Sequence, residues 1–105
     1  MNRDRLPDRR LAERFEFKVG NISYTAQLGY YLDGRLGEVF LNAGKIGAES
    51  DVVARDSAIA VSFALQHGCA AETIRAAFMR DESGKSEGPL GVLFDKIAER
   101  TRGAS

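Results

Sequence analysis

Few residues of this chain have types and spacing suited to chemistry. Among its 105 residues there is one cysteine, Cys69, and one histidine, His67. A structural zinc site takes about four Cys or His ligands, so these two residues cannot build one. His67 is expected in the last turn of a helix, where a positive charge suits the helix dipole, and Cys69 beside two alanines is expected to be a small buried residue rather than a nucleophile. The sequence therefore contains no complete catalytic constellation.

A glycine-rich segment offers a second candidate for chemistry. Gly84-Lys85-Ser86 is similar to the end of a phosphate-binding loop, but the full motif needs another glycine where Met79 stands and a strand where a helix is expected. A nucleotide-hydrolysing loop is therefore excluded. Residues 81–88 are either an anion or ligand site at a helix N-terminus or a solvated connector. The candidate ligand residues are two cations and three glycines: Arg80, Gly84, Lys85, Gly88 and Gly91.

A buried carboxylate is the third candidate. In a helix over about 51–67, Asp56 falls among Val52, Ile59 and other apolar residues, and a carboxylate in such surroundings needs a partner. Two interpretations stay open: an ion pair with Arg9 or Arg10 of the N-terminal segment, or a contact with a ligand or another subunit.

Composition limits the function classes. Lys+Arg and Asp+Glu both number 15, so the formal net charge is zero, which argues against non-specific nucleic-acid binding and adds no repulsion between copies. The length fits a single domain. Residues 1–10 are charged and unlike a signal peptide, no apolar run could span a bilayer, and one cysteine suits a reducing compartment, so a cytoplasmic location is expected.

The elements that must position these residues follow from periodicity. Alternating apolar residues predict strands over 15–19, 22–30 and 36–42, and Gly20-Asn21 and Asp33-Gly34 predict the hairpin turns between them. The result is an antiparallel β-meander with one apolar face and two open edges. Residues 1–14 are expected to form an extended charged arm, followed by a single domain over residues 15–103.

Three helices are predicted to cover the apolar face, which gives an α+β fold. They span about 51–67, capped by Ser50 or Asp51 and ended by Gly68, then 71–80, and a third beginning at Pro89. The first is apolar nearly all round, with a narrow polar stripe of Arg55, Ser62 and Gln66. A helix of this kind packs on the sheet and on other helices or another subunit, so a homo-oligomer is expected.

Several strings carry a family resemblance. They are residues 5–10 (RLPDRR), 33–40 (DGRLGEVF), 45–47 (KIG), 62–68 (SFALQHG) and 88–91 (GPLG). In this order and spacing the chain resembles the TSCPD domain, found towards the C-terminus of vitamin B12-dependent (class II) ribonucleotide reductases. The resemblance extends over residues 5–100. Five residues are candidates for structural or partner contacts. Arg35 and Glu38 belong to the second string, Arg9 and Arg10 belong to the first, and Asp56 lies in the predicted helix.

The resemblance has two departures. The Ser-Cys-Pro-Asp motif of the family precedes the last helix, whereas this chain has Glu87-Gly88-Pro89-Leu90 there and keeps only the proline. Ribonucleotide reduction needs a radical cysteine and a separate reducing pair, which Cys69 alone cannot supply. No reaction is therefore assigned to the chain by itself.

The resemblance implies a non-catalytic accessory or regulatory module in DNA precursor synthesis, which binds a reductase subunit or a nucleotide. It has no cofactor of its own, and cobalamin enters only through a partner reductase. The alternative is a stand-alone homo-oligomeric protein that binds or sequesters nucleotides and has no connection with a reductase.

Overall fold

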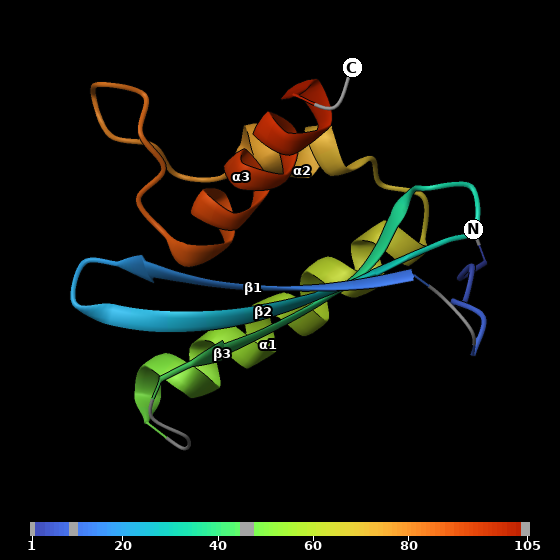
Figure 1. The fold of residues 1–105 in the computed structure, drawn as a ribbon, viewed down its shortest axis with the longest axis horizontal. Coiled ribbons are helices and arrows are strands. Elements are labelled where there is room, and N and C mark those ends of the chain that lie inside the picture. Colours follow the sequence, from blue (N-terminus) through green and yellow to red (C-terminus); the bar gives the residue numbers. More distant parts are fainter. Residues whose placement is uncertain (1, 9–10, 45–47, 104–105) are drawn as a thin grey trace.

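The alternating apolar residues form a three-stranded antiparallel sheet. The computed structural model describes residues 2–8, 11–44 and 48–103. Strands β1 (Leu11–Val19), β2 (Ile22–Tyr30) and β3 (Leu36–Ala43) are paired in chain order (Figure 1). Phe17 lies opposite Tyr24, and Ala26 lies opposite Leu41, so apolar side chains share one face of the sheet. The predicted meander is confirmed, and β1 begins at Leu11 rather than at Phe15.

Glycines close both hairpins, as predicted. Gly20 has a φ of 60° and Gly34 a φ of 94°, in the left-handed region that a residue without Cβ adopts at little cost. In the second turn the Asp33 carboxylate accepts the backbone N–H of Arg35 at 3.1 Å, which fixes the turn locally.

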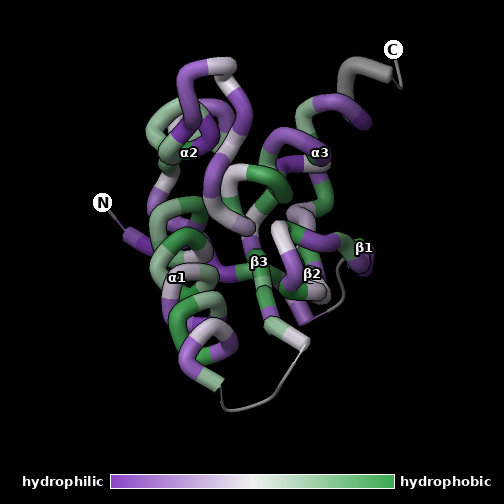
Figure 2. Tube along the Cα trace, turned by 90° about the vertical axis from the view of Figure 1, so that its left-hand side faces the viewer, coloured by the Kyte–Doolittle hydropathy of each residue, from purple (hydrophilic) through white to green (hydrophobic). Residues whose placement is uncertain are grey.

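Three helices follow the sheet: α1 (Glu49–Gln66), α2 (Ala71–Ala77) and α3 (Pro89–Gly103). In Figure 1, α1 runs along β3, and α2 packs against α3. Figure 2 shows α3 above β1 and β2, whereas α2 lies above α1. Gly68, with a φ of 95°, follows the end of α1 as expected. The fold is α+β, as the sequence predicted.

Two helix boundaries differ from the prediction. The residue that precedes α1 as its N-cap is Ala48, with no side-chain cap, so the expected cap by Ser50 or Asp51 is wrong. The second helix ends at Ala77 and not at Arg80, because Phe78 is extended and Arg80 forms an isolated bridge with Ser86.

The core lies between the apolar face of the sheet, α1 and α3. Alanines on α1 face the sheet, and their small side chains let the helix approach the strands closely. Phe94 and Leu93 of α3 are almost fully enclosed. The core residues are Phe17, Tyr24, Ala26, Leu28, Val39, Leu41 and Ala43 from the sheet, Ala54, Ala58 and Leu65 from α1, and Leu90, Leu93 and Phe94 from α3.

The orientation of α1 is the main departure from the sequence analysis. Ser62 and Gln66 of the predicted polar stripe are buried, with 9% and 4% of their surfaces exposed. Val52 and Ile59 are instead 48% and 51% exposed. Figure 2 shows α1 at the outside of the molecule beyond β3, with hydrophobic stretches recurring along its length. Ser62 and Gln66 of the polar stripe therefore face the sheet edge, Arg55 is exposed, and a large part of the apolar surface faces outward.

Within the described part of the chain, every helix is too short or too polar to cross a lipid bilayer.

Candidate functional site

The buried polar residues of α1 bind the backbone of β3. The Asp51 carboxylate accepts the N–H of Ala43 at 3.0 Å. The Ser62 hydroxyl accepts the N–H of Val39 at 2.9 Å and donates to its carbonyl at 3.0 Å. The Gln66 amide donates to the carbonyl of Gly37 at 2.9 Å.

Gly37, Val39 and Ala43 are separated by even numbers of positions along β3, and the bonded groups point away from β2. Helix α1 therefore occupies the edge that a fourth strand would use. The expectation of two open sheet edges is therefore wrong for β3. The physical reason is that the free N–H and C=O groups of an edge strand can form hydrogen bonds with side chains as well as with another strand. Serine is suited to this position because its hydroxyl both donates and accepts.

Asp56 does not have the predicted environment. It is exposed and lies on the outward side of α1, so the expectation that it is buried is wrong. Its apolar neighbours were identified correctly, but that sector of the helix faces away from the core. The proposed partners Arg9 and Arg10 lie outside the described residues.

The N-terminal segment packs near the end of α1. The backbone N–H of Asp4 donates to the carbonyl of Gln66 at 2.7 Å, and the Tyr31 hydroxyl donates to the carbonyl of Asp4. Arg35 contacts Asp33 at 2.7 Å and Asp4 at 3.4 Å, and its guanidinium lies over the Tyr31 ring. Arg35 therefore makes a structural contact within the chain. Glu38 is half-buried on β3.

The glycine-rich loop is organised by its own residues. The Asp81 carboxylate accepts the backbone N–H groups of Ser83 and Lys85 at 2.9 and 3.0 Å. Gly84 has a φ of 87°, and its carbonyl accepts a hydrogen bond from Arg80 at 3.1 Å. These contacts close residues 81–86 into a compact turn, while Lys85 is exposed.

Besides its hydrogen bond to Gly84, Arg80 binds Asp95. Its guanidinium donates to the two carboxylate oxygens at 2.8 and 3.1 Å, Arg75 donates at 2.8 Å, and the Ser86 hydroxyl donates at 2.6 Å. The Arg80 hydrogen bonds, followed by those from Ser86 and Arg75, hold the pKa of Asp95 well below its usual range. This cluster ties α2 and the loop to α3, so Arg80 is committed to a carboxylate of its own chain.

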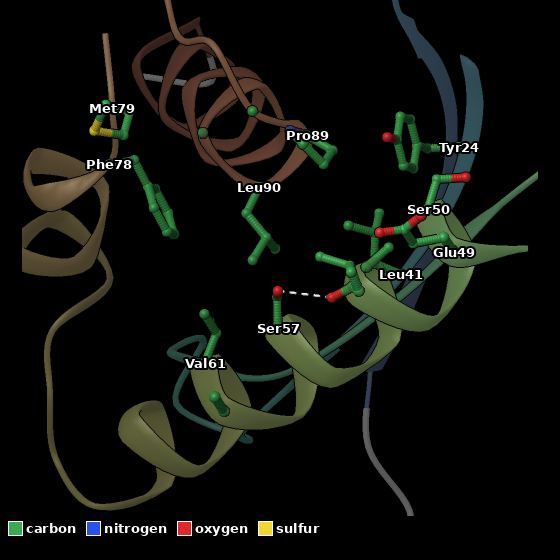
Figure 3. A pocket seen from close by; sticks show the side chains of 15 residues that line it. Tyr24, Leu41, Glu49, Ser50, Ser57, Val61, Phe78, Met79, Pro89 and Leu90 are labelled. Atoms are coloured by element: carbon green, nitrogen blue, oxygen red, sulfur yellow. Dashed lines mark hydrogen bonds between the residues drawn. The ribbon is translucent and has the colours of Figure 1, made fainter.

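The two remaining candidate glycines line a cleft between α1 and the start of α3. The cleft has a volume of about 770 Å³, and Figure 3 shows Val61, Phe78 and Leu90 directed into it. Its lining is mostly apolar, and the polar members are Tyr24, Glu49, Ser50 and Ser57.

The chemistry of the cleft favours a neutral ligand over a phosphate. The described residues that line it include no Lys or Arg, and Glu49 is acidic. The Ser57 hydroxyl donates to the Val53 carbonyl at 2.7 Å and so has its hydrogen committed. The volume lies in the range of small-molecule sites, about 300–1,000 Å³. Gly88 and Gly91 are thus brought to a cavity, whereas Arg80, Gly84 and Lys85 do not line it.

The two residues first considered for catalysis do not combine. His67 is exposed, and its Nδ1 lies 2.8 Å from the Phe63 carbonyl oxygen. Cys69 is half-buried rather than buried as expected. Within the described ranges, no group of three or more His, Cys, Asp or Glu residues could hold a metal ion.

The outward side of α1 is a second candidate site, which the sequence analysis did not locate. We call Val52, Ile59, Phe63 and the adjoining Phe40 of β3 the outer α1 surface. All four are between 45% and 51% exposed. Phe40 and Ile59 together line a shallow groove of about 350 Å³, so the helix and the strand share this surface. Asp56 lies on the same side of the helix.

Comparison with known proteins relates the chain to reductases. It is 41% identical over 66 residues to a vitamin B12-dependent ribonucleotide reductase of Bradyrhizobium diazoefficiens, a match that covers 63% of this chain and 5% of that protein. It is 36% identical over 76 residues to the vitamin B12-dependent ribonucleotide reductase of Agrobacterium fabrum, covering 72% of this chain and 6% of that protein. The match thus spans about one-twentieth of these relatives' length. No family model and no solved structure matches the chain.

The length of the match fixes which elements it includes. A continuous stretch of 76 residues in a chain of 105 must contain residues 30–76, wherever it begins. These residues include the whole of β3 and α1. The aligned stretch therefore includes the whole of α1.

Proposed function

We propose that this chain is a TSCPD-type, non-catalytic module that binds the large chain of a vitamin B12-dependent ribonucleotide reductase. The observation that carries the proposal is the similarity to a segment forming only 5–6% of such reductases. The proposal assigns this chain an accessory or regulatory role in a cytoplasmic pathway of DNA precursor synthesis.

The non-catalytic part of the proposal is supported by the inventory of reactive groups. Cys69 is the single cysteine, whereas ribonucleotide reduction needs more than one thiol. Cobalamin chemistry would belong to the partner chain. The isolated protein is expected to show no ribonucleotide reduction above a Cys69→Ala control when supplied with adenosylcobalamin and a thiol reductant.

Binding to a reductase has more support than binding to a nucleotide. The cations proposed for a phosphate are separated from the cleft, because Arg80 binds Asp95 and Lys85 does not line the cavity. An apolar cleft beside an acidic residue offers little to a triphosphate. By contrast, the outer α1 surface has the apolar character of a protein interface core.

The test is direct binding to the reductase of the same organism. The full chain is titrated into the purified B12-dependent reductase, and complex formation is followed by light scattering on a size-exclusion column. A complex at micromolar concentrations is the expected result. If no complex forms at tens of micromolar while ATP or a deoxynucleotide binds the isolated chain, the reductase proposal is wrong and the sequestering alternative replaces it.

A further inference from the structure

The outer α1 surface is unusual for a helix at the outside of a domain. Such a helix normally keeps its apolar residues towards the core and its polar residues towards water. In α1 the buried side combines three apolar core residues, Ala54, Ala58 and Leu65, with the polar Asp51, Ser62 and Gln66. The larger apolar side chains of Val52 and Ile59 face outward. The fold does not need these two side chains, because the opposite side of the helix binds the sheet.

We infer that the outer α1 surface is the docking site for the reductase chain, which covers Val52, Ile59, Phe63 and Phe40 with apolar side chains and places a basic residue against Asp56. This inference rests on the proposed function and specifies which surface performs it.

The first argument that a reductase chain covers this surface is the length of the matched reductases beyond the similar segment. The match to the reductases includes residues 30–76 and hence the whole of α1 and Phe40. In those proteins the matched segment is joined to some 94–95% of further chain. That remaining chain is available to cover an apolar surface that the segment itself leaves exposed.

The charge of Asp56 is the second argument, and it separates a reductase from a second copy of this chain. Asp56 stands between Val52 and Ile59, near the middle of the outward stripe that ends at Phe63. A two-fold axis through the middle of the stripe would bring the Asp56 carboxylates of both copies to within about one helical turn of each other. Arg55, the basic residue of the groove that Phe40 and Ile59 line, pairs with Asp51 of its own helix at 3.8 Å. Two Asp56 charges taken out of water together therefore oppose such a dimer, whereas a basic residue of another protein stabilises the contact.

The closed edge of β3 sets the mode of docking. Side chains of α1 bind the Gly37 carbonyl, the Val39 N–H and carbonyl, and the Ala43 N–H. A partner cannot add a strand there without displacing them. Docking therefore uses the side chains of α1 in a groove of the partner.

Charge and size substitutions on α1 test the inference. Ile59→Glu places a second carboxylate in the apolar centre and is expected to weaken reductase binding about 30-fold or more, as for an interface hot spot. Asp56→Arg is expected to weaken it about tenfold by opposing the partner's basic residue. Leu32→Glu, at a site that is 81% exposed in the turn before β3, is the matched control and should bind as the wild type does.

The outcomes separate the two proposals. If the wild type fails to bind the reductase, the proposed function is wrong. If the wild type binds and Ile59→Glu and Asp56→Arg bind equally well, the docking inference is wrong while the proposed function stands. Melting temperatures within a few degrees of wild type show that the variants fold. A wild-type homodimer that Ile59→Glu converts to monomer would assign the surface to a second copy and overturn the inference.

Discussion

The two sides of α1 depart from the usual arrangement of a surface helix, because polar residues lie among the apolar ones on the inner side and large apolar residues lie on the outer side. The inner side meets β3 through Asp51, Ser62 and Gln66, with four hydrogen bonds to backbone groups. The outer side presents Val52 and Ile59 to the surroundings. The difference shows that the element packed against a side chain decides whether a polar residue can be buried there. An edge strand has N–H and C=O groups without a strand partner, so the helix beside it buries polar side chains that bind them.

The largest expected effect comes from Asp51→Ala on the inner side. The carboxylate is fully buried, and its removal leaves the Ala43 N–H without its acceptor. Loss of a hydrogen bond to a charged group costs about 1.5–3 kcal/mol. At about 4–8 °C per kcal/mol, the melting temperature should fall by about 6–24 °C in a calorimetric scan.

Asp56→Ala is the matched control on the outer side, where the carboxylate is exposed. It should melt within about 2 °C of wild type, because surface substitutions usually change stability by less than about 0.5 kcal/mol. Equal losses in the two variants would show that the two sides have been assigned wrongly.

The next effect is that of Ser62→Ala. Alanine leaves both the N–H and the carbonyl of Val39 without the hydroxyl that binds them, which should cost about 1–2 kcal/mol. Amide hydrogen exchange at Val39 should accelerate, which denaturation alone would not reveal. Ser57→Ala removes a hydroxyl that bonds only its own helix at Val53, and its stability should stay within about 0.5 kcal/mol of wild type. If amide exchange at Val39 is no faster in Ser62→Ala than in Ser57→Ala, the role given to Ser62 is wrong.

Asp95→Asn tests a second polar cluster, which joins α2 and the loop to α3 and depends on charge more than the contacts between α1 and β3 do. The two arginines lower the pKa of Asp95 in the folded protein, so its stabilisation is complete above the ordinary carboxylate pKa of about 3.9. It is lost as the pH falls through the lower, folded-state pKa. The variant should be about 1–2 kcal/mol less stable at pH 7.

Urea unfolding at pH 7, 4 and 3 measures this difference. The gap between wild type and Asp95→Asn should be constant near neutrality and should narrow below about pH 4. A gap that is unchanged down to pH 3 would mean that packing, and not the charge of Asp95, explains the loss.

The smallest effect on stability is expected for Ile59→Ser on the outer side. The side chain is already half exposed, so the free energy of unfolding should fall by no more than about 0.5–1 kcal/mol in the isolated protein. Chemical denaturation gives this value directly. A loss as large as that of Asp51→Ala would place Ile59 in the core.

The sheet could be predicted from the sequence because its signals are local. Alternating residues mark the strands, and Gly20 and Gly34 provide the positive φ that the turns require. The end of α1 near Gly68 and the start of α3 at Pro89 are likewise each indicated by a single residue. Backbone conformation at these points depends on the residue itself and little on distant contacts.

The orientation of α1 could not be predicted from hydrophobicity. An apolar helix with a narrow polar stripe fits either a stripe in water or a stripe on a strand edge, and the two differ only in tertiary contacts. One signal could have distinguished them: Ser62 and Gln66 lie one turn apart, and Asp51 lies three turns before Ser62, so all three share one side at intervals that match alternate strand residues.

The candidate anion site failed for a similar reason. The sequence brings Arg80 close to Gly84 and Lys85, but it does not show that Asp95, 15 positions later, takes the guanidinium. Arginine in a polar loop is available to a ligand only if no carboxylate of the fold is nearer. That information lies in the packing of α2 against α3.

The covered edge of β3 also limits how copies of this domain can polymerise. Fibrils that grow strand upon strand need two free edges per molecule, one to receive and one to offer. Here the Gly37 carbonyl, the Val39 N–H and carbonyl, and the Ala43 N–H are already bonded to α1. In the described sheet this leaves β1 as the edge that neither a strand nor α1 covers. Two molecules could join through β1, but the pair would then present no further template, so growth by this route stops at two.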